Sequence, residues 1–297
     1  MQVHVQTTRS AGGECASGGA AEPRRGWCRA AFPLLLGLVS LLGAGAGVRA
    51  ADPPAAGAKV LTVYVPCGML SAFFKVQEQF EAQHRDVQLK LEFDRADALT
   101  DRILKEGATP DVHLSIGHVE TDLLVQGGKV EAKTPVAFGR FRLALCANRS
   151  RREVITCVED LAKPEVKTIL LTPAANTSVG TYARDALIKL GLWEKVAAKV
   201  KYLPTIKDCY RDLAGGKADA SFAYIGCPLP IDASKAEYSK VISVQTLDEG
   251  LYGGAVVFAS VLKGAAHPAE AAEFVRLLNS AEVQALLAPI GLLPAGT

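Results

Sequence analysis

The sequence lacks the short motifs that mark several common enzyme classes. It contains no Cys-x-x-Cys, Gly-x-Ser-x-Gly or His-Glu-x-x-His arrangement, and no histidine lies near Cys67 in the sequence. These motifs bring together two thiols, a serine nucleophile or two zinc ligands. A thiol oxidoreductase or a hydrolase that uses Cys67 is therefore the least favoured alternative. We expect a protein that is not an enzyme and that needs no cofactor.

Basic stripes with interleaved aromatic residues are also missing. Residues 1–50 hold five arginines and two glutamates, so without them the formal net charge changes from +2 to −1. A nearly neutral chain without a basic stripe gives no support for a nucleic-acid partner. Aromatic residues make up only 6% of the chain and apolar residues 49%, a composition that suits packed α/β layers.

The first fifty residues have the pattern of an export signal. Arg24, Arg25 and Arg29 precede an uncharged run over residues 30–48, and Val48-Arg49-Ala50 is a small-x-small cleavage pattern. A transmembrane anchor is disfavoured because the run is short for a membrane span and contains Pro33 and several glycines. We expect a periplasmic protein whose signal peptide, residues 1–50, is cleaved near Ala50. Export by the Sec or the twin-arginine route stays open. Residues 51–58 are expected to form a flexible leader.

Two stretches have the pattern of a strand, a turn of small residues and an amphipathic helix. In residues 168–190 an apolar strand is followed by residues 173–180, which include no large side chain, and by a helix that Thr177 or Ser178 can cap. Residues 60–80 have the same pattern. Uncapped N–H groups at a helix start favour an anion. We therefore expect a ligand between two such turns.

Changes of pattern along the chain divide it into two lobes. Strands alternate with helices from Lys59 onward, and near Phe138 a strand without a preceding helix leads into a second such group. An apolar strand near residues 255–261 then completes the first group. We predict an α/β protein with lobe 1 at residues 59–138 plus 250–297 and lobe 2 at residues 139–249, joined by two crossings. Each lobe is expected to be a mostly parallel sheet flanked by helices.

Several segments within residues 59–293 form a set that resembles a known family. They are Leu61-Thr-Val-Tyr64 with the small loop and helix after it, Phe93 through Ile103, Gly107-Ala-Thr-Pro-Asp-Val-His-Leu-Ser115, Thr172–Leu187 followed by Leu190-Gly-Leu-Trp193, Gly216-Lys-Ala-Asp-Ala-Ser-Phe-Ala-Tyr224 and Ile290-Gly291. The set resembles the periplasmic molybdate-binding proteins of ABC importers. The resemblance implies the two-lobed periplasmic binding protein fold, a small inorganic oxyanion of the molybdate or tungstate type as ligand, and a membrane permease as partner. We expect a monomer. A periplasmic sensor would use the same fold and site, so that alternative stays open.

The resemblance also implies a set of ligand-binding residues. In that family serine hydroxyls, backbone N–H groups at helix starts and a tyrosine hydroxyl hold the oxyanion. Gly68 stands where the first serine would be, and Arg95 and Ala96 lie where the second would be. Arg95 either meets the anion or pairs with a neighbouring aspartate. The expected ligand-binding residues are Cys67, Gly68, Arg95, Ala96, Ser178, Val179, Gly180, Cys209 and Tyr224.

The cysteines offer an alternative ligand class. Cys67, Cys209 and Cys227 each fall at or near a turn on the expected ligand side, and converging thiolates would make a soft site for a thiophilic metal or metalloid such as Cu, Zn or As. The competing structural interpretation is a Cys209–Cys227 disulfide, with Cys67 a small buried residue. Cys146 and Cys157 bracket a turn and are expected to form a disulfide or a buried pair.

Overall fold

The computed structural model describes residues 57–225 and 238–295. The predicted signal peptide, most of the predicted leader and Cys227 lie outside the described residues. No helix of the described part of the chain is long and apolar enough to span a membrane.

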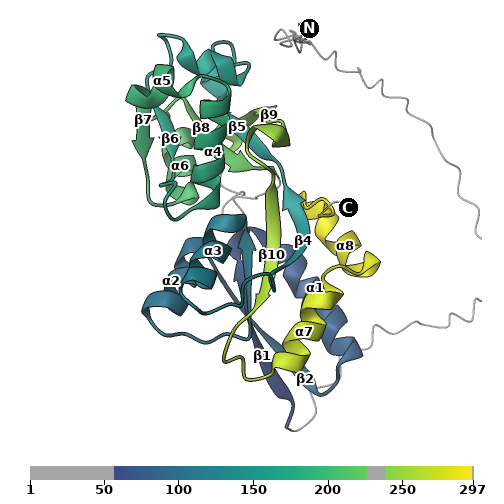
Figure 1. Cartoon of the computed structure of the whole chain (residues 1–297). Coiled ribbons are helices and arrows are strands. Elements are labelled where there is room, and N and C mark those ends of the chain that lie inside the picture. The colour runs from purple at the N-terminus through teal and green to yellow at the C-terminus, as the bar shows by residue number, and fades with distance from the viewer. Residues whose placement is uncertain (1–56, 226–237, 296–297) are drawn as a thin grey trace, which may run out of the picture. The chain divides into compact units, whose positions relative to one another are not determined.

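The first sheet has five strands in the order β2-β1-β3-β10-β4 (Figure 1). Their bounds are β1 Lys59–Pro66, β2 Val87–Asp94, β3 Val112–Ile116, β4 Val136–Phe141 and β10 Ala255–Val261. Strand β1 pairs in parallel with β2 and β3, whereas β10 runs antiparallel to β3 and β4. The helices that accompany this sheet are α1 Leu70–Gln83, α2 Ala96–Lys105, α3 His118–Gln126, α7 Pro268–Leu277 and α8 Ala281–Leu287.

The second sheet has five strands in the order β7-β6-β8-β5-β9. Their bounds are β5 Leu143–Asn148, β6 Ile169–Leu171, β7 Val200–Tyr202, β8 Ala220–Tyr224 and β9 Val241–Thr246. Strand β6 pairs in parallel with β7 and β8, and β5 runs antiparallel to β8 and β9. Helices α4 Ser178–Lys189, α5 Trp193–Val196 and α6 Ile206–Ala214 accompany it.

Apolar patterning accounts for these elements. The last four residues of β1 are buried, as expected of a strand covered on both faces. Helix α1 buries Ala72, Phe73, Val76 and Phe80, which recur at helical spacing and pack into the main core. The prediction of two α/β sheets flanked by helices is confirmed. Both sheets are mixed, because in each of them four strands run in one direction and one strand, β10 in the first sheet and β5 in the second, runs opposite to them.

The chain passes between the sheets at two places. It leaves the first sheet after Phe141 and enters the second at Leu143, and it returns between β9 and β10. The sequence pattern suggested one strand over residues 141–146, but β4 and β5 are two strands of different sheets. A lobe boundary after residue 138 would therefore fall inside β4. The lobe limits given above stay a prediction.

Candidate functional site

A cavity of about 100 Å³ lies at the carboxyl ends of the parallel strands of both sheets. In open α/β sheets ligands bind at this edge. On the side of the first sheet, residues that follow β1, β2 and β3 line the cavity; on the side of the second, residues that follow β6, β7 and β8 do so. The lining residues are Pro66, Cys67, Gly68, Arg95, Ala96, Asp97, Ile116, Glu120, Thr172, Thr177, Val179, Pro204, Thr205, Ile206 and Tyr224.

Four helix starts contribute to this lining. Gly68 lies in the turn before α1, Ala96 and Ile206 are the first residues of α2 and α6, and Val179 is the second residue of α4. The first N–H groups of a helix have no intrahelical acceptor and carry partial positive charge. Only α6 uses its N-cap side chain, since Thr205 Oγ1 accepts the Asp208 N–H at 3.0 Å. The cavity therefore has a surplus of backbone donors.

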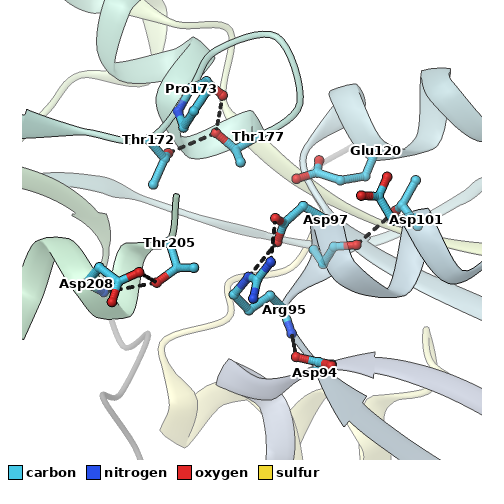
Figure 2. A network of polar contacts seen from close by, with 12 residues as sticks. Asp94, Arg95, Asp97, Asp101, Glu120, Thr172, Pro173, Thr177, Thr205 and Asp208 are labelled. Atoms are coloured by element: carbon cyan, nitrogen blue, oxygen red, sulfur yellow. Dashed lines mark hydrogen bonds and ion pairs between the residues drawn. The ribbon is translucent and has the colours of Figure 1, made fainter. Parts of the chain in front are cut away.

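The start of α4 differs from the sequence-based expectation. Thr177 is the N-cap residue but its side chain does not cap the helix. Its hydroxyl lies 2.8 Å from Thr172 Oγ1 and donates to the Pro173 carbonyl (Figure 2). Ser178 also does not cap α4, because its side chain contacts α3 instead. Gly180 is not in the cavity lining, and a Cβ there would lie 2.2 Å from the Thr172 carbonyl oxygen.

Arg95 is held by its own helix. Its guanidinium donates to both carboxylate oxygens of Asp97, Nε at 3.1 Å and Nη2 at 3.0 Å (Figure 2). The Asp97 carboxylate raises the pKa of Arg95, so the cation persists. Asp94 accepts the Arg95 backbone N–H and pairs with Arg102 at 2.6 Å. Of the two alternatives for Arg95, pairing with an aspartate is what the structure contains.

Glu120 is the buried carboxyl group of the site. It lies on the first turn of α3, only 3% of it is exposed, and it lines the cavity. One carboxylate oxygen accepts the Ser178 backbone N–H at 3.2 Å and the other accepts the Ser178 hydroxyl. Burial raises the pKa of Glu120 to about 6, and the Ser178 hydrogen bonds only partly oppose that rise. The first N–H of α4 is thus already occupied by an anion of the protein itself.

Helices α3 and α4 bond to each other at their first turns. The Val119 N–H donates to Ser178 Oγ at 3.1 Å, and the His118 N–H donates to the Tyr182 hydroxyl at 3.2 Å. His118 Nδ1 also lies 2.9 Å from that hydroxyl. With the Glu120 contacts, each helix supplies acceptors for the orphan N–H groups of the other. Ser178 was expected to bind the ligand, but its hydroxyl and its N–H both form hydrogen bonds between α3 and α4, and it does not line the cavity.

The structure contradicts both disulfides considered from the sequence. Cys209 is a free thiol, fully buried beside Leu170 and Leu213, so it forms no disulfide with Cys227. Burial raises its pKa to about 12, which disfavours the thiolate that a soft-metal site would need. Its backbone N–H donates to the Thr205 carbonyl at 3.1 Å and is not a ligand donor. Cys146 is free and Cys157 is disulfide-bonded, so these two form no disulfide with each other, although both are buried as expected.

The soft-metal site is not assembled within the part of the chain that the structure describes. Cys67 lines the cavity, whereas Cys209 lies in an apolar cluster outside its lining. Cys227 lies outside the described residues. Over residues 57–225 and 238–295 no group of three or more His, Cys, Asp or Glu side chains is placed to hold a metal ion. Burial and Asp94 raise the pKa of Cys67, which also disfavours a thiolate.

Six of the nine expected ligand-binding residues line the cavity. These are Cys67, Gly68, Arg95, Ala96, Val179 and Tyr224. Tyr224 ends β8, and its hydroxyl donates to the Ile116 carbonyl at 3.3 Å. Sequence reasoning missed Glu120, Thr172 and Thr205. The Thr205-x-x-Asp208 spacing is a capping signal that marks the start of α6, whereas nothing local marks Glu120.

Two sheets with a cavity at their carboxyl edges, reached by helix starts from both, define a two-lobed periplasmic binding protein. The match to a family model agrees with this class. The chain belongs to the bacterial extracellular solute-binding protein family, whose model matches residues 61–292.

Two curated relatives are similar over most of the chain. The putative ABC transporter substrate-binding lipoprotein YvgL of Bacillus subtilis is 24% identical over 231 residues, which cover 78% of this chain and 85% of the relative. The molybdate-binding protein ModA of Mycobacterium tuberculosis is 26% identical over 263 residues, which cover 86% of this chain and 95% of the relative.

Solved structures share the fold at lower identity. A substrate-binding domain of a putative molybdenum ABC transporter from Clostridium difficile has a TM-score of 0.61 at 21% identity, over 80% of this chain and 100% of that one. The sulfate-binding protein SubI of Mycobacterium tuberculosis has a TM-score of 0.64 at 16% identity, over 80% of this chain and 87% of that one. Iron-bound HitA of Pseudomonas aeruginosa has a TM-score of 0.60 at 18% identity, over 80% of this chain and 86% of that one. These three are named for molybdenum, sulfate and iron, so the fold alone does not select a ligand.

Proposed function

We propose that this protein is the exported substrate-binding subunit of an ABC importer and that its cavity holds a small inorganic oxyanion of the molybdate or tungstate type. It binds the ion between its two lobes and delivers it to a membrane permease. It acts as a monomer, without a cofactor and without catalysing a reaction. The observation that carries this proposal is the convergence of four helix starts on one cavity.

The donors at these helix starts favour an anion over a cation. The N–H groups of Val179 and Gly180 have no hydrogen-bond acceptor within the described part of the chain. Partial positive charge at helix N-termini is the common device for holding phosphate-like groups without a counter-ion. Arg95 is already paired, because both carboxylate oxygens of Asp97 accept hydrogen bonds from one edge of its guanidinium, Nε and Nη2. The ligand would therefore be held mainly by backbone N–H groups. The lining hydroxyls already donate within the protein: Thr172 to Thr177, Thr205 to Asp208 and Tyr224 to the Ile116 carbonyl.

The size of the cavity favours an ion over an organic solute. Pockets for drug-sized molecules measure about 300–1,000 Å³, whereas this cavity measures about 100 Å³. A tetrahedral oxyanion fits such a volume. The 26% identity to a molybdate-binding relative over 95% of its length supports the choice of molybdate or tungstate.

The compartment and partner follow from the same proposal. Residues 1–50 act as a cleaved signal peptide, which places the mature protein in the periplasm, where a permease of an ABC importer is the receiver. The intact mass of the protein recovered from the periplasm tests this part, because it shows at which residue the chain begins. It should correspond to a chain that begins at Ala51, and a chain that retains residues 1–50 would contradict it.

Calorimetric titration of the purified mature protein tests the ligand class. Molybdate and tungstate should bind with a Kd in the micromolar range or below, and sulfate and phosphate more weakly. Cu(I) and arsenite serve as the thiophilic comparison. Tight binding of a thiophilic ion without binding of any oxyanion would overturn the proposal.

A further inference from the structure

The cavity carries more negative charge than an oxyanion site needs. Glu120 and Asp97 both line it, and Arg95 is the only cation among the described lining residues. Because Arg95 pairs with Asp97, the Glu120 carboxylate is left without a cation, and no ion pair joins it to another described residue. A doubly charged oxyanion would enter a cavity in which one negative charge is uncompensated.

The surroundings of Glu120 supply little that could balance this charge. On α3 itself the neighbours are His118, which bonds to Tyr182, and Asp122. Helix α2 brings Asp97, whose charge also raises the pKa of Glu120, and helix α4 brings the Tyr182 phenol. Strand β10 adds no titratable side chain, and His113 on β3 stays neutral because burial lowers its pKa to about 3.

The Ser178 hydroxyl can serve both protonation states of Glu120. It now accepts the Val119 N–H and donates to the carboxylate. A hydroxyl oxygen has two acceptor sites. After protonation of Glu120, the carboxyl O–H can donate to the second site of Ser178 Oγ, or to an oxygen of a ligand in the cavity. The contact between α3 and α4 therefore survives when the charge is removed.

We infer that Glu120 sets the charge that the cavity accepts, so that a doubly charged oxyanion binds together with one proton, which the Glu120 carboxylate takes up from solvent. The inference rests on the function proposed above. The pair of ligand and protonated Glu120 carries the charge of the dianion alone, and no other bond forms or breaks. Glu120 is thus a specificity residue that favours oxyanion binding at acidic pH.

Proton uptake on binding tests this inference with the unmodified mature protein. Molybdate is titrated by calorimetry at pH 7.5 in two non-phosphate buffers that differ in ionisation enthalpy, and the difference in binding heat gives the protons taken up. We expect nearly one proton per molybdate. Between pH 6.5 and 8 the affinity should fall about tenfold per pH unit, as linkage of one proton requires. A flat affinity with no proton uptake would overturn the inference.

Two variants assign the proton to a residue. Glu120→Gln keeps the size of the side chain and should bind molybdate without proton uptake, and at pH 8 more than tenfold more tightly than the wild type. Asp97→Asn is the matched control, since it also removes one negative charge from the lining but should retain the uptake. If Glu120→Gln takes up the proton as the wild type does, Glu120 is not the acceptor. If neither the wild type nor the variants bind any oxyanion at any pH, it is the proposed function that fails.

Discussion

Gly117 and Ser178 approach so closely that no side chain fits between them. A Cβ atom on Gly117 would lie 2.2 Å from Ser178 Cβ, 2.3 Å from Ser178 Oγ and 3.0 Å from the Tyr182 hydroxyl. Gly117 also has φ of +111°, a conformation that other residues rarely adopt. The absence of a side chain at this position lets the first turns of α3 and α4 exchange their hydrogen bonds.

Gly117→Ala should therefore destabilise the protein through both its backbone conformation and the clash with Ser178. Gly128→Ala is the comparison, because Gly128 also has positive φ, +68° against +111° at Gly117, but a Cβ there meets nothing within 4 Å. We expect a cost of about 1 kcal/mol for the control and at least about 3 kcal/mol for Gly117→Ala, since strain and a clash add. Urea denaturation of both variants measures the difference. Equal costs would show that the Gly117–Ser178 approach does not matter for stability.

The backbone donor at Val179 can be removed by proline. Val179→Pro should weaken molybdate binding tenfold or more, because a hydrogen bond to a charged group contributes about 1.5–3 kcal/mol. Glu282→Pro tests the cost of proline alone, since Glu282 is the exposed second residue of α8 and lies away from the cavity. Calorimetry should find normal affinity in this control. Unchanged affinity in Val179→Pro would exclude Val179 as a donor.

Cys67→Ser separates the oxyanion from the thiophilic ligand. Cys67 lines the cavity, and a serine there adds a hydroxyl that is a stronger hydrogen-bond donor than a thiol. We expect molybdate affinity to be unchanged or up to about tenfold higher, in line with about 0.5–1.5 kcal/mol for one neutral hydrogen bond. Parallel titrations with Cu(I) and arsenite complete the test. A wild type that binds these ions tightly, together with a variant that does not, would favour the thiol interpretation.

Glu120 should also make stability depend on pH. Its pKa rises from 4.5 to about 6 in the folded protein, so between these values the folded state binds more protons than the unfolded state. Stability from this group is therefore highest below pH 4.5 and is lost as the pH rises to 6, by about 2 kcal/mol in total.

His113 changes the pH dependence of stability in the opposite direction, over a pH range that overlaps that of Glu120. Its pKa falls from 6.5 to about 3, so the unfolded state binds the extra proton and stability declines as the pH falls below 6.5. The difference between the wild type and Glu120→Gln isolates the carboxyl group, because both contain His113. Without ligand, the free energy of unfolding of Glu120→Gln, measured by urea denaturation, should rise by about 2 kcal/mol relative to that of the wild type between pH 4.5 and pH 7. An identical pH profile for the two proteins would contradict the buried carboxylate.

Local patterns predicted much of the fold. The apolar strands at residues 60–65 and 168–172 and the small-residue turns after them mark β1 and β6, because burial on both faces and backbone freedom leave local signatures in the sequence. Strand β9 has no buried position in its six residues and was missed. The division between β4 and β5 was missed as well, since one polar residue, Arg142, separates two strands of different sheets.

The site was predictable only in part, for a different reason. Helix starts reveal backbone donors, so Val179 and Gly68 could be placed from sequence. The partners of Ser178 and Cys209 are tertiary: Ser178 bonds to Glu120, which lies 58 residues away, and Cys209 packs against Leu170. No spacing rule connects such pairs. Glu120 became a candidate only when the structure placed its carboxyl group in the cavity.

The order of strands in the first sheet bears on how the chain folds as it is made. Strand β10 lies between β3 and β4, yet it follows β4 by more than a hundred residues, whereas all five strands of the second sheet come from one continuous stretch, residues 143–246. The second sheet can therefore assemble as soon as its own stretch is available. The first sheet lacks a central strand until residues 255–261 have been synthesised. Because synthesis begins at the N-terminus, the sheet whose first strands are made earliest is completed last. Until then that sheet presents unpaired edges of β3 and β4, which exposes it to aggregation.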